Sequence, residues 1–429
     1  MPPMAEAFRP AWVEVDLAAV RHNAGLLARL VAPAQLCAVV KADGYGHGAP
    51  DVAAAALDGG ATWLAVALVE EGLALRAAGV TAPVLLLSEP TDEAMREAVA
   101  HGLTPTLYRH GGVAAARRAA TGVARPVPVH LKVDTGMHRV GASPRDAPAV
   151  ARAIASAPEL ELEGLFTHLA VADEPDDPFT AHQLRVFDEV RRELADDGIR
   201  PAIVHAANSA GAIAHPAARL DLVRCGIACY GHLPSPALAG HLGAGPPPAR
   251  FDPGAALRPA LSLRARVHLV RELAAGERTS YGLAYELPLR SQVAVIPLGY
   301  HDGVPRALER GGGEVLVGGR RRRIAGTVTM DQIIVDCGPD GGVRPGDEAV
   351  LIGPQGDEEI TAEEWAERLG TICYEVLCGI GPRVPRVAVH RQDAATPTGA
   401  GGQAPGAGGC PPGALRGLVT PDGAGVLRR

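Results

Sequence analysis

The chain has 429 residues, which is enough for two or three domains or for one large barrel with an extra domain. Its 41 Lys+Arg and 48 Asp+Glu residues give a net charge of −7 without a basic stripe, which argues against a nucleic-acid partner. Aromatic residues make up only 3 %, so the core must be built from Val, Leu, Ile and Ala, as in a parallel α/β sheet covered by Ala-rich helices. No apolar run is long enough to predict a membrane span.

The two ends of the chain differ in composition from the rest. Residues 1–11 are expected to be disordered, and Met1–Pro10 lacks the apolar segment of a signal peptide. Residues 391–429 are rich in Gly and Pro and are predicted to be a disordered tail. The seven cysteines show neither a CxxC pair nor zinc-type spacing, so we expect buried thiols, no metal site and a cytoplasmic location.

Short apolar segments alternate with Ala-rich helical stretches between residues 36 and 227. The predicted strands are Leu36–Val40, Trp63–Ala67, Pro83–Leu87, Leu103–Leu107, Pro128–Val133, Gly164–His168, Ala202–His205 and Asp221–Arg224. The predicted helices include Ala49–Leu57, Leu68–Ala77, Asp92–Ala100, Pro148–Ala157 and Phe179–Ala195. Eight β/α units over about 200 residues match a TIM barrel, and a doubly wound open sheet is the alternative.

The pattern changes after a Pro-rich linker, Leu242–Pro253, so we expect a barrel domain over 12–245 and a mostly β domain over 246–390. Predicted elements of the β domain are a half-buried strand over Leu261–Leu269, a strand Glu314–Arg320 entering a hairpin at Gly318-Gly319, strands Ile324–Val328, Ile333–Cys337 and Ala349–Ile352, and a helix Thr361–Leu369 with a capping box of Thr361 and Glu364. Trp12–Asp16 alternates in the same way and is a candidate to pair with this domain. The run Arg320–Arg323 is interpreted as a solvated hairpin rather than a phosphate-binding patch.

Distinctive polar residues fall at the carboxyl ends of the predicted barrel strands. They are Lys41, the segment Asp134–Arg139, His168, Asn208, Ser209, Arg224, Gly226 and Ile227. In a TIM barrel these positions converge on one mouth, where active sites are built, whereas an open sheet brings together only the neighbours of its switch point. The placement of these residues therefore favours the barrel.

Two features of this mouth carry chemistry. Lys41 closes an apolar strand, so partial desolvation is expected to lower its pKa and free an amine for Schiff-base formation; a surface lysine is the alternative. Ser209 opens a helix whose free N–H groups form an anion cradle, although it could be a plain N-cap. Neither GxGxxG nor a Walker motif is present. A phosphate site opposite a reactive lysine points to pyridoxal 5′-phosphate.

An ordered set of motifs then makes the sequence recognisable. These are Val40-Lys-Ala-Asp-Gly-Tyr-Gly-His-Gly, Lys132-Val-Asp-Thr-Gly-Met-His-Arg139-Val-Gly, Thr167-His-Leu-Ala-Val-Ala-Asp-Glu, Asn208-Ser, Arg224-Cys-Gly-Ile-Ala, Ser280-Tyr-Gly, Gly299-Tyr-His-Asp-Gly and Thr329-Met-Asp-Gln. From Val13 to Val389 the chain resembles the alanine racemase family, apart from His138, His301 and Cys229 at positions where the family usually has other residues. The resemblance implies a TIM barrel followed by a β domain, bound pyridoxal 5′-phosphate, and a head-to-tail homodimer with shared active sites.

The resemblance also implies the catalytic roles. Lys41 would carry the cofactor as a Schiff base and act as one base, and Tyr281 from the partner subunit would be the second base, because inversion of a chiral carbon needs a proton removed from one face and returned to the other. His168, with Arg224 behind it, would activate the phenol. Arg224 would bond the pyridine nitrogen and keep it unprotonated, which favours racemisation over transamination. Barrel-type decarboxylases place a carboxylate there instead.

The remaining implied site residues bind cofactor or substrate. The phosphate ligands would be Tyr45, Ser209 with Asn208 beside it, the N–H groups of Gly226 and Ile227, and Tyr374. Arg139 would contact the cofactor's phenolic oxygen and the substrate carboxylate, oriented by Lys132, which is carbamylated in some members of the family. From the partner subunit, Met330 and Asp331 would reach the substrate carboxylate, and Tyr300 would narrow the entry.

The predicted activity is interconversion of L- and D-alanine, supplying D-alanine for peptidoglycan. Three alternatives stay open at this point: a broader racemase that accepts serine, because an apolar pocket rejects one extra hydroxyl only weakly; a non-catalytic protein that binds pyridoxal phosphate; and a catalytically decayed member of the family. The β domain with Tyr281, Met330 and Asp331 argues against a carrier, and the intact catalytic positions argue against decay.

Overall fold

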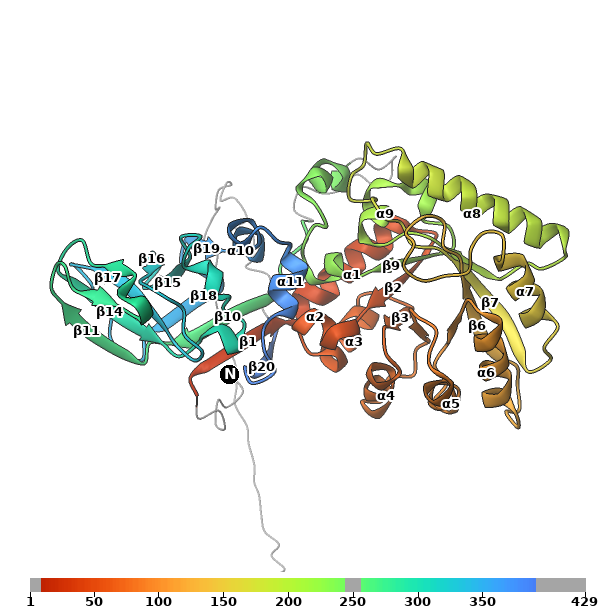
Figure 1. Ribbon diagram of the computed structural model, residues 1–429, viewed down its shortest axis with the longest axis horizontal. Coiled ribbons are helices and arrows are strands. Elements are labelled where there is room, and N and C mark those ends of the chain that lie inside the picture. Colours follow the sequence, from red (N-terminus) through yellow and green to blue (C-terminus); the bar gives the residue numbers. More distant parts are fainter. Residues whose placement is uncertain (1–8, 244–255, 391–429) are drawn as a thin grey trace, which may run out of the picture. The chain divides into compact units, whose positions relative to one another are not determined.

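The computed structural model describes residues 9–243 and 256–390 (Figure 1). The predicted disordered tail 391–429, residues 1–8 and most of the predicted linker lie outside the described residues. Within the described part, two four-stranded parallel sheets lead into a larger, mostly antiparallel sheet.

The two parallel sheets together form the barrel. One has the order β4-β3-β2-β9 and the other the order β5-β6-β7-β8. Their strands are β2 (Gln35–Val39), β3 (Trp63–Val66), β4 (Val84–Leu86), β5 (Thr106–Leu107), β6 (Val127–Lys132), β7 (Leu160–Phe166), β8 (Ile203–His205) and β9 (Leu222–Cys225). A parallel bridge between Leu85 and Thr104 joins β4 to β5, and the Asp221 N–H donates to the Val204 carbonyl at 3.0 Å where β8 meets β9. The ring is therefore closed, which confirms the TIM barrel and excludes the open sheet.

Helices cover the outside of this ring, and α3 to α8 follow one another around it in Figure 1. The helices of the barrel are α1 (Leu17–Val31), α2 (Lys41–Gly46), α3 (Ala49–Asp58), α4 (Val69–Ala77), α5 (Asp92–Ala100), α6 (His110–Ala120), α7 (Ala147–Ala155), α8 (Phe179–Asp196) and α9 (Ser209–Ala214). Strands β3 and β4 consist of Val, Leu, Ala and one Trp, all buried, because both faces of a barrel strand are covered.

The C-terminal domain is built on one large sheet with the order β11-β14-β17-β16-β15-β18-β10-β1-β20, and β19 pairs with β18. The elements are β1 (Ala11–Asp16), β10 (Leu261–Arg266), β11 (Leu269–Leu273), β12 (Arg278–Thr279), β13 (Tyr285–Glu286), β14 (Ser291–Ile296), β15 (Glu314–Val317), β16 (Arg320–Ile324), β17 (Ile333–Gly338), β18 (Glu348–Gln355), β19 (Glu358–Ile360), α10 (Ala362–Leu369), α11 (Cys373–Cys378) and β20 (Arg386–Val389). Strand β1 pairs antiparallel with β10 and parallel with β20, so the start of the described chain is part of this sheet.

Two strand predictions in this domain were wrong. The predicted strand Leu261–Leu269 is interrupted after Arg266, and β10 and β11 pair with different neighbours. Strand β10 is also buried on both faces rather than one, because Arg264 is neutralised by Glu14 and Glu348 at 3.0 and 2.6 Å. The predicted strand Ile324–Val328 does not form, since Ile324 is the last residue of β16 and the chain turns at Gly326, whose φ is +96°.

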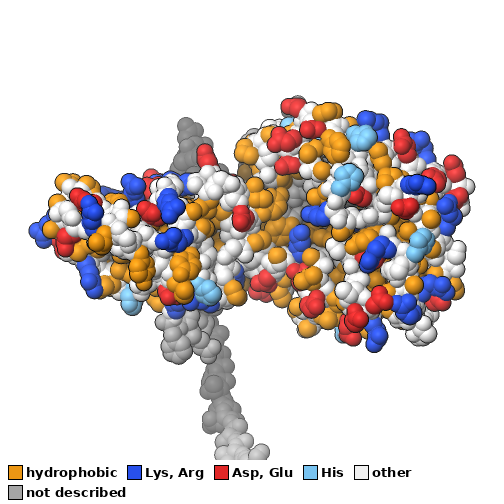
Figure 2. Space-filling model, viewed as in Figure 1, with side chains coloured by type: hydrophobic (Ala, Val, Ile, Leu, Met, Phe, Trp, Pro, Cys, Tyr) orange, Lys and Arg blue, Asp and Glu red, His pale blue; other side chains and the backbone are white. Residues whose placement is uncertain are grey.

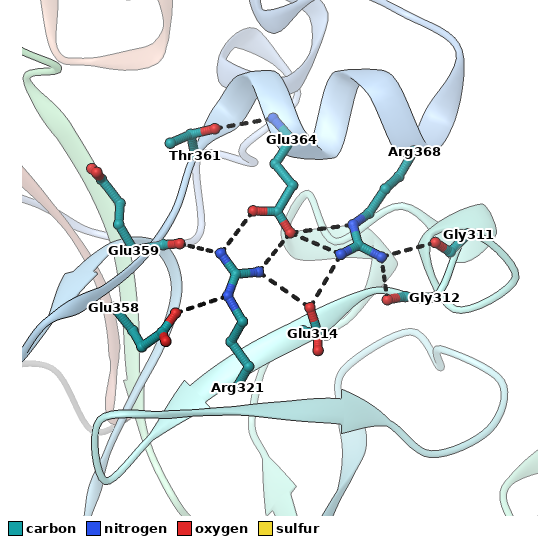
Figure 3. Close-up of polar contacts among 9 residues, drawn as sticks. All are labelled: Gly311, Gly312, Glu314, Arg321, Glu358, Glu359, Thr361, Glu364 and Arg368. Carbon is teal, nitrogen blue, oxygen red and sulfur yellow. Dashed lines mark hydrogen bonds and ion pairs between the residues drawn. The ribbon is translucent and has the colours of Figure 1, made fainter.

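The hairpin between β15 and β16 forms at the predicted turn. Gly318 and Gly319 have φ values of +64° and +70°, a pair of left-handed conformations that glycine adopts without steric cost. The arginine run that follows was interpreted as simply solvated, and this is wrong for Arg321. Its guanidinium is bonded to the carboxylates of Glu314, Glu358 and Glu364 at 2.8 to 3.1 Å (Figure 3).

The same cluster explains why the predicted capping box is incomplete. The Thr361 hydroxyl accepts a bond from the Glu364 N–H at 3.1 Å, which caps α10 as expected. The Glu364 carboxylate, however, points to Arg321 and Arg368 instead of returning to the N-cap (Figure 3). Helix α10 is thus fastened to the β15–β16 hairpin by charge.

Candidate active site

A cavity of about 550 Å³ lies at the carboxyl ends of the barrel strands. The site residues predicted from this chain all line it: Lys41, Tyr45, Lys132, Arg139, His168, Asn208, Ser209, Arg224, Gly226, Ile227 and Tyr374. They come from strands and loops separated by more than three hundred residues of sequence, and α11 of the C-terminal domain supplies one edge through Tyr374 and Cys378.

Lys41 begins a left-handed turn directly after β2. Residues 42 to 45 have φ values of +51° to +62°, a conformation that costs non-glycine residues about 1–2 kcal/mol each and often marks functional sites. Side-chain acceptors hold this turn: the Ala42 N–H donates to Glu71 at 2.6 Å, and the Ala49 N–H donates to Asp43 at 2.8 Å. Burial lowers the pKa of Lys41, and the positive charge of Arg139 lowers it further, as predicted for a nucleophilic amine.

The same cavity contains a cradle for an anion. Ser209 begins α9, and its hydroxyl accepts bonds from the N–H groups of Gly226 and Ala228 at 2.9 and 3.4 Å. Any Cβ at Gly226 would overlap the Tyr45 hydroxyl, so only glycine fits there. The ring of Tyr374 lies 6.1 Å from that of Tyr45. Hydroxyl groups and backbone donors of this kind suit a phosphate.

Arg224 occupies the floor of the cavity and is 3 % exposed. Its Nη1 donates to His205 Nδ1 at 2.8 Å, and its Nη2 donates to the carbonyls of Thr167 and Ala206 at 2.9 and 3.0 Å. Among the described residues its Nε has no hydrogen-bond partner, which leaves one N–H for a ligand acceptor. Burial lowers the pKa of Arg224 to about 10, so the group stays cationic at neutral pH.

His168 and Lys132 line the cavity beside Arg224. His168 Nδ1 lies 3.3 Å from Arg224 Nη2, and burial together with that charge lowers the pKa of His168 well below its usual range, so its ring is neutral. The Lys132 side chain is 5 % exposed, with Nζ 5.5 Å from the centre of the Phe166 ring. Burial, Arg224 and Arg139 lower the pKa of Lys132 to about 8. The whole sequence contains two lysines, and both line this cavity.

The predicted residues from the partner subunit do not line the cavity of their own chain. Tyr281 is 73 % exposed and starts a short 3₁₀ turn, Tyr281–Leu283. The preceding Ser280 has a φ of +61° and is held by a bond from its hydroxyl to the Thr327 carbonyl at 2.5 Å. Met330 and Tyr300 are also exposed.

Asp331 forms an ion pair with Arg383 at 2.6 Å. The Met330 N–H has no partner among the described residues, although the Met330 carbonyl accepts from His301 at 3.1 Å. These partner-side groups therefore present free donors and aromatic rings on the surface of the C-terminal domain rather than in the barrel mouth.

Two aromatic residues of the site were not predicted. Phe166 lines the cavity beneath Lys132 and packs 5.1 Å from the Arg224 guanidinium. His205 stacks on Phe166 with ring centres 4.6 Å apart and planes at 9°.

Asn208, predicted as a cofactor ligand, uses its side chain to cap α9 by accepting from the Gly211 N–H at 2.9 Å.

The charge of the cavity matches an anionic ligand. Lys41, Lys132, Arg139 and Arg224 all line it, and the described lining residues include no acidic side chain. A phosphate in the cradle and a ring acceptor at Arg224 Nε would satisfy the donors that the protein leaves open, so the residues fit pyridoxal 5′-phosphate. In the described part of the chain, no helix combines the length and hydropathy that crossing a membrane would require.

Comparison with known proteins agrees with this geometry. Family models described as "Alanine racemase, N-terminal domain" and "Alanine racemase, C-terminal domain" match residues 15–234 and 260–388. Alanine racemases of Symbiobacterium thermophilum and Thermobifida fusca are 47 % and 45 % identical, over 89 % and 88 % of this chain and 97 % of each relative.

Solved structures show the same similarity. The alanine racemase of D-cycloserine-producing Streptomyces lavendulae has a TM-score of 0.82 at 38 % identity, covering 90 % of this chain and 99 % of that one. The alanine racemase of Bacillus anthracis has a TM-score of 0.81 at 36 % identity, covering 90 % and 96 %. The chain belongs to the alanine racemase family.

Proposed function

We propose that the protein is an alanine racemase that interconverts L- and D-alanine with pyridoxal 5′-phosphate. The observation that carries this proposal is that one cavity is lined by Lys41, by the anion cradle at Ser209 and Gly226, and by the buried Arg224. When bound, the cofactor supplies an aldehyde that condenses with amines and a ring that withdraws electrons from the α-carbon. The residues of the chain bind and orient the cofactor and substrate and move the protons.

The chain's own groups hold and orient the cofactor. Ser209, Tyr45 and Tyr374 would bind the phosphate together with the N–H groups of Ile227 and of Gly226, which here donates to the Ser209 hydroxyl, and Arg224 Nε would donate to the ring nitrogen. Because Arg224 remains cationic, that nitrogen accepts a hydrogen bond without being protonated. By leaving that nitrogen unprotonated, Arg224 would moderate the electron withdrawal by the ring and so favour return of the proton to the α-carbon.

Two bases complete the reaction. Lys41 Nζ serves one face of the α-carbon, and the partner subunit's Tyr281 serves the other. The exposure of Tyr281 supports a shared site, since this side chain does not reach the cavity of its own chain. A head-to-tail homodimer would bring it there, together with the partner subunit's Met330, Asp331 and Tyr300.

Exposed apolar side chains support the same assembly. Most of the large hydrophobic side chains at the surface of the described residues belong to the C-terminal domain: Leu269, Tyr281, Leu283, Leu289, Tyr300, Met330 and Ile372. Figure 2 shows apolar side chains at the surface of this domain among cationic side chains, which are all arginines because both lysines lie in the barrel. A surface of this kind favours burial against a second copy.

Arg139 is assigned to the substrate carboxylate and the phenolic oxygen of the cofactor. Lys132 would orient it, and the lowered pKa of Lys132 supports modification of this lysine by CO₂, because only the neutral amine forms a carbamate. The carbamate would also supply the cavity with a negative charge that it lacks.

Borohydride reduction of the loaded protein, followed by peptide mapping, tests the covalent attachment. The label is expected on Lys41, and Lys132 is a built-in control, because it is the one other side-chain amine in the sequence and lines the same cavity. A label on Lys132, or on neither lysine, would contradict the assignment.

The role of Tyr281 as a base is tested with isotopic exchange at the α-carbon. Tyr281→Phe is expected to lose racemisation by about two to four orders of magnitude while the cofactor stays bound. Full activity of this variant in both directions would remove Tyr281 as a base. Equal specificity constants for alanine and serine would favour the broader racemase. The cytoplasmic location and the supply of D-alanine to peptidoglycan remain predictions.

A further inference from the structure

A line of four polar side chains leads from the cavity floor into the barrel wall. Arg224 Nη1 lies 2.8 Å from His205 Nδ1, His205 Nε2 lies 2.9 Å from His130 Nδ1, and His130 Nε2 lies 3.3 Å from Glu163 Oε2. The four residues come from β9, β8, β6 and β7. Both imidazoles are fully buried, and the Glu163 side chain is 25 % exposed.

The chemistry at the two ends fixes every proton in between. Arg224 can only donate, so His205 Nδ1 must be the acceptor and its Nε2 must carry the proton. That N–H then donates to His130 Nδ1, which places the second proton on His130 Nε2, facing Glu163. An ionised carboxylate can only accept, so all three bonds run in one direction, from Arg224 to Glu163.

Two local features of β6 and β7 accommodate this line of side chains. Gly164 follows Glu163 on β7, and any Cβ there would overlap the His130 ring. The pairing of β6 with β7 shifts register between Val129 and His130. Burial lowers the pKa of both histidines, and the charge of Arg224 lowers that of His205 further, which agrees with neutral rings of a single tautomer.

We propose that Glu163, acting through His130 and His205, is a positioning residue that selects the histidine tautomers and thereby fixes the Arg224 guanidinium with its Nε toward the cavity. The functional part of this inference rests on the proposed function, in which Arg224 meets the ring nitrogen of the cofactor. If either tautomer were reversed, an N–H of His205 would face an N–H of Arg224 or of His130. Reversal at His205 would remove the bond at Nη1 and leave the guanidinium held by the Nη2 bonds to the Thr167 and Ala206 carbonyls, so the direction of Nε would be less closely fixed.

The test compares Glu163→Leu, which removes the acceptor, with Glu163→Gln, which keeps one acceptor oxygen. Glu161→Leu is the matched control, because Glu161 lies two residues earlier on the same strand and is exposed. Nitrogen-15 NMR of the histidine rings is expected to show both His130 and His205 neutral and protonated at Nε2 in the wild type and in the Gln variant. In Glu163→Leu the Nε2 proton of His130 loses its acceptor, so His130 should show mixed tautomers, and His205 should reverse with it in those molecules in which its Nδ1 gives up the bond from Arg224.

Two measurements on the loaded protein accompany the NMR. In Glu163→Leu the absorbance spectrum of the bound cofactor should shift, and kcat for alanine should fall about tenfold, the size of one lost hydrogen bond to a charged group, with KM within twofold. Glu163→Gln should restore most of kcat, and Glu161→Leu should match the wild type. A purely structural role would lower stability without moving the spectrum or separating kcat from KM.

The outcomes separate the two proposals. An active wild type whose Glu163→Leu variant keeps single tautomers, spectrum and kcat overturns the positioning role while leaving the racemase intact. A wild type without racemase activity overturns the proposed function, whereas the NMR result still tests whether Glu163 selects the histidine tautomers. If Glu163→Leu does not fold, the wild-type NMR decides alone: a proton on Nδ1 of either ring, or a charged ring, refutes the proposal.

Discussion

Replacing Lys132 by Met is expected to stabilise the cofactor-free protein, and the gain should depend on pH. The side chain is 5 % exposed, and its surroundings lower its pKa from an ordinary 10.5 to about 8. This lowering means that the folded state resists protonation of Lys132. At pH values where the amine is protonated in both states, the cost to folding is about 3 kcal/mol.

The sign follows from proton binding. Below pH 8 the amine is charged in both states and the full cost applies, whereas between pH 8 and 10.5 the unfolded chain binds more protons and the stability of the wild type rises with pH. The same relation leaves a cost of about 2 kcal/mol at pH 9 and almost none above pH 10.5. Loss of the contact between Nζ and the Phe166 ring offsets about 0.5–1 kcal/mol of the gain. The net gain of Lys132→Met is therefore about 2 kcal/mol at pH 6 and about 1 kcal/mol at pH 9.

Urea unfolding at pH 6 and pH 9, in buffers free of CO₂ and cofactor, measures this difference. Arg139→Met is the control, because Arg139 is an exposed cation lining the same cavity, and its replacement should change the free energy of unfolding by less than about 0.5 kcal/mol at either pH. If Lys132→Met is less stable than the wild type at pH 6, or if its gain does not shrink at pH 9, the buried ammonium is not a burden on the fold and the reasoning fails.

Three further changes probe the cradle, the charge cluster and a buried carboxylate. Gly226→Ala should weaken cofactor affinity at least tenfold, because the new methyl group overlaps the Tyr45 hydroxyl; unchanged affinity by equilibrium dialysis would contradict the cradle. Arg321→Met should lower the free energy of unfolding in urea by about 2 kcal/mol. The control Arg290→Met removes one member of an exposed ion pair and should lower it by less than about 0.5 kcal/mol. Equal losses would mean that the cluster in Figure 3 adds no stability. Asp302→Asn should lower the free energy of unfolding at pH 7 by about 3–5 kcal/mol. Burial raises the pKa of the Asp302 carboxyl, but two arginines and a backbone N–H outweigh this effect, so its pKa is lowered overall. In an acid titration of stability, the wild type should therefore lose its advantage over the variant as the pH falls below about 4.

The barrel could be predicted because its signal is local. Segments such as Trp63–Ala67 and Pro83–Leu87 are short and wholly apolar, as strands buried on both faces must be, and the polar residues that follow them mark the mouth. The turn at Gly318-Gly319 was equally legible, because consecutive left-handed residues need glycine. Each of these features depends on a few neighbouring residues.

What could not be predicted depends on pairing across long stretches of sequence. His130 and His205 are 75 residues apart, and each lies in an apolar strand where a histidine predicts nothing particular. Their contact follows from the order of β6, β7 and β8 and from a register shift that no local pattern reveals. The prediction for the strand around Arg264 was wrong for a related reason. The alternation of apolar and polar residues there suggested that Arg264 faces solvent, whereas carboxylates from β1 and β18 pair with its guanidinium and bury it. Tyr281 is exposed and lies outside the cavity of its own chain, and its predicted place in a site concerns the proposed dimer, which the fold of one chain does not test.

The two lysines give the protein an unusual handle. All other cationic side chains are guanidinium groups, which do not react with amine-directed reagents such as activated esters, so the surface offers such reagents no side-chain target outside the barrel mouth. Saturating that mouth with ligand before labelling would leave the α-amino group of the chain as the sole reactive amine. Immobilisation or dye conjugation could then proceed through one defined point of attachment without mutagenesis.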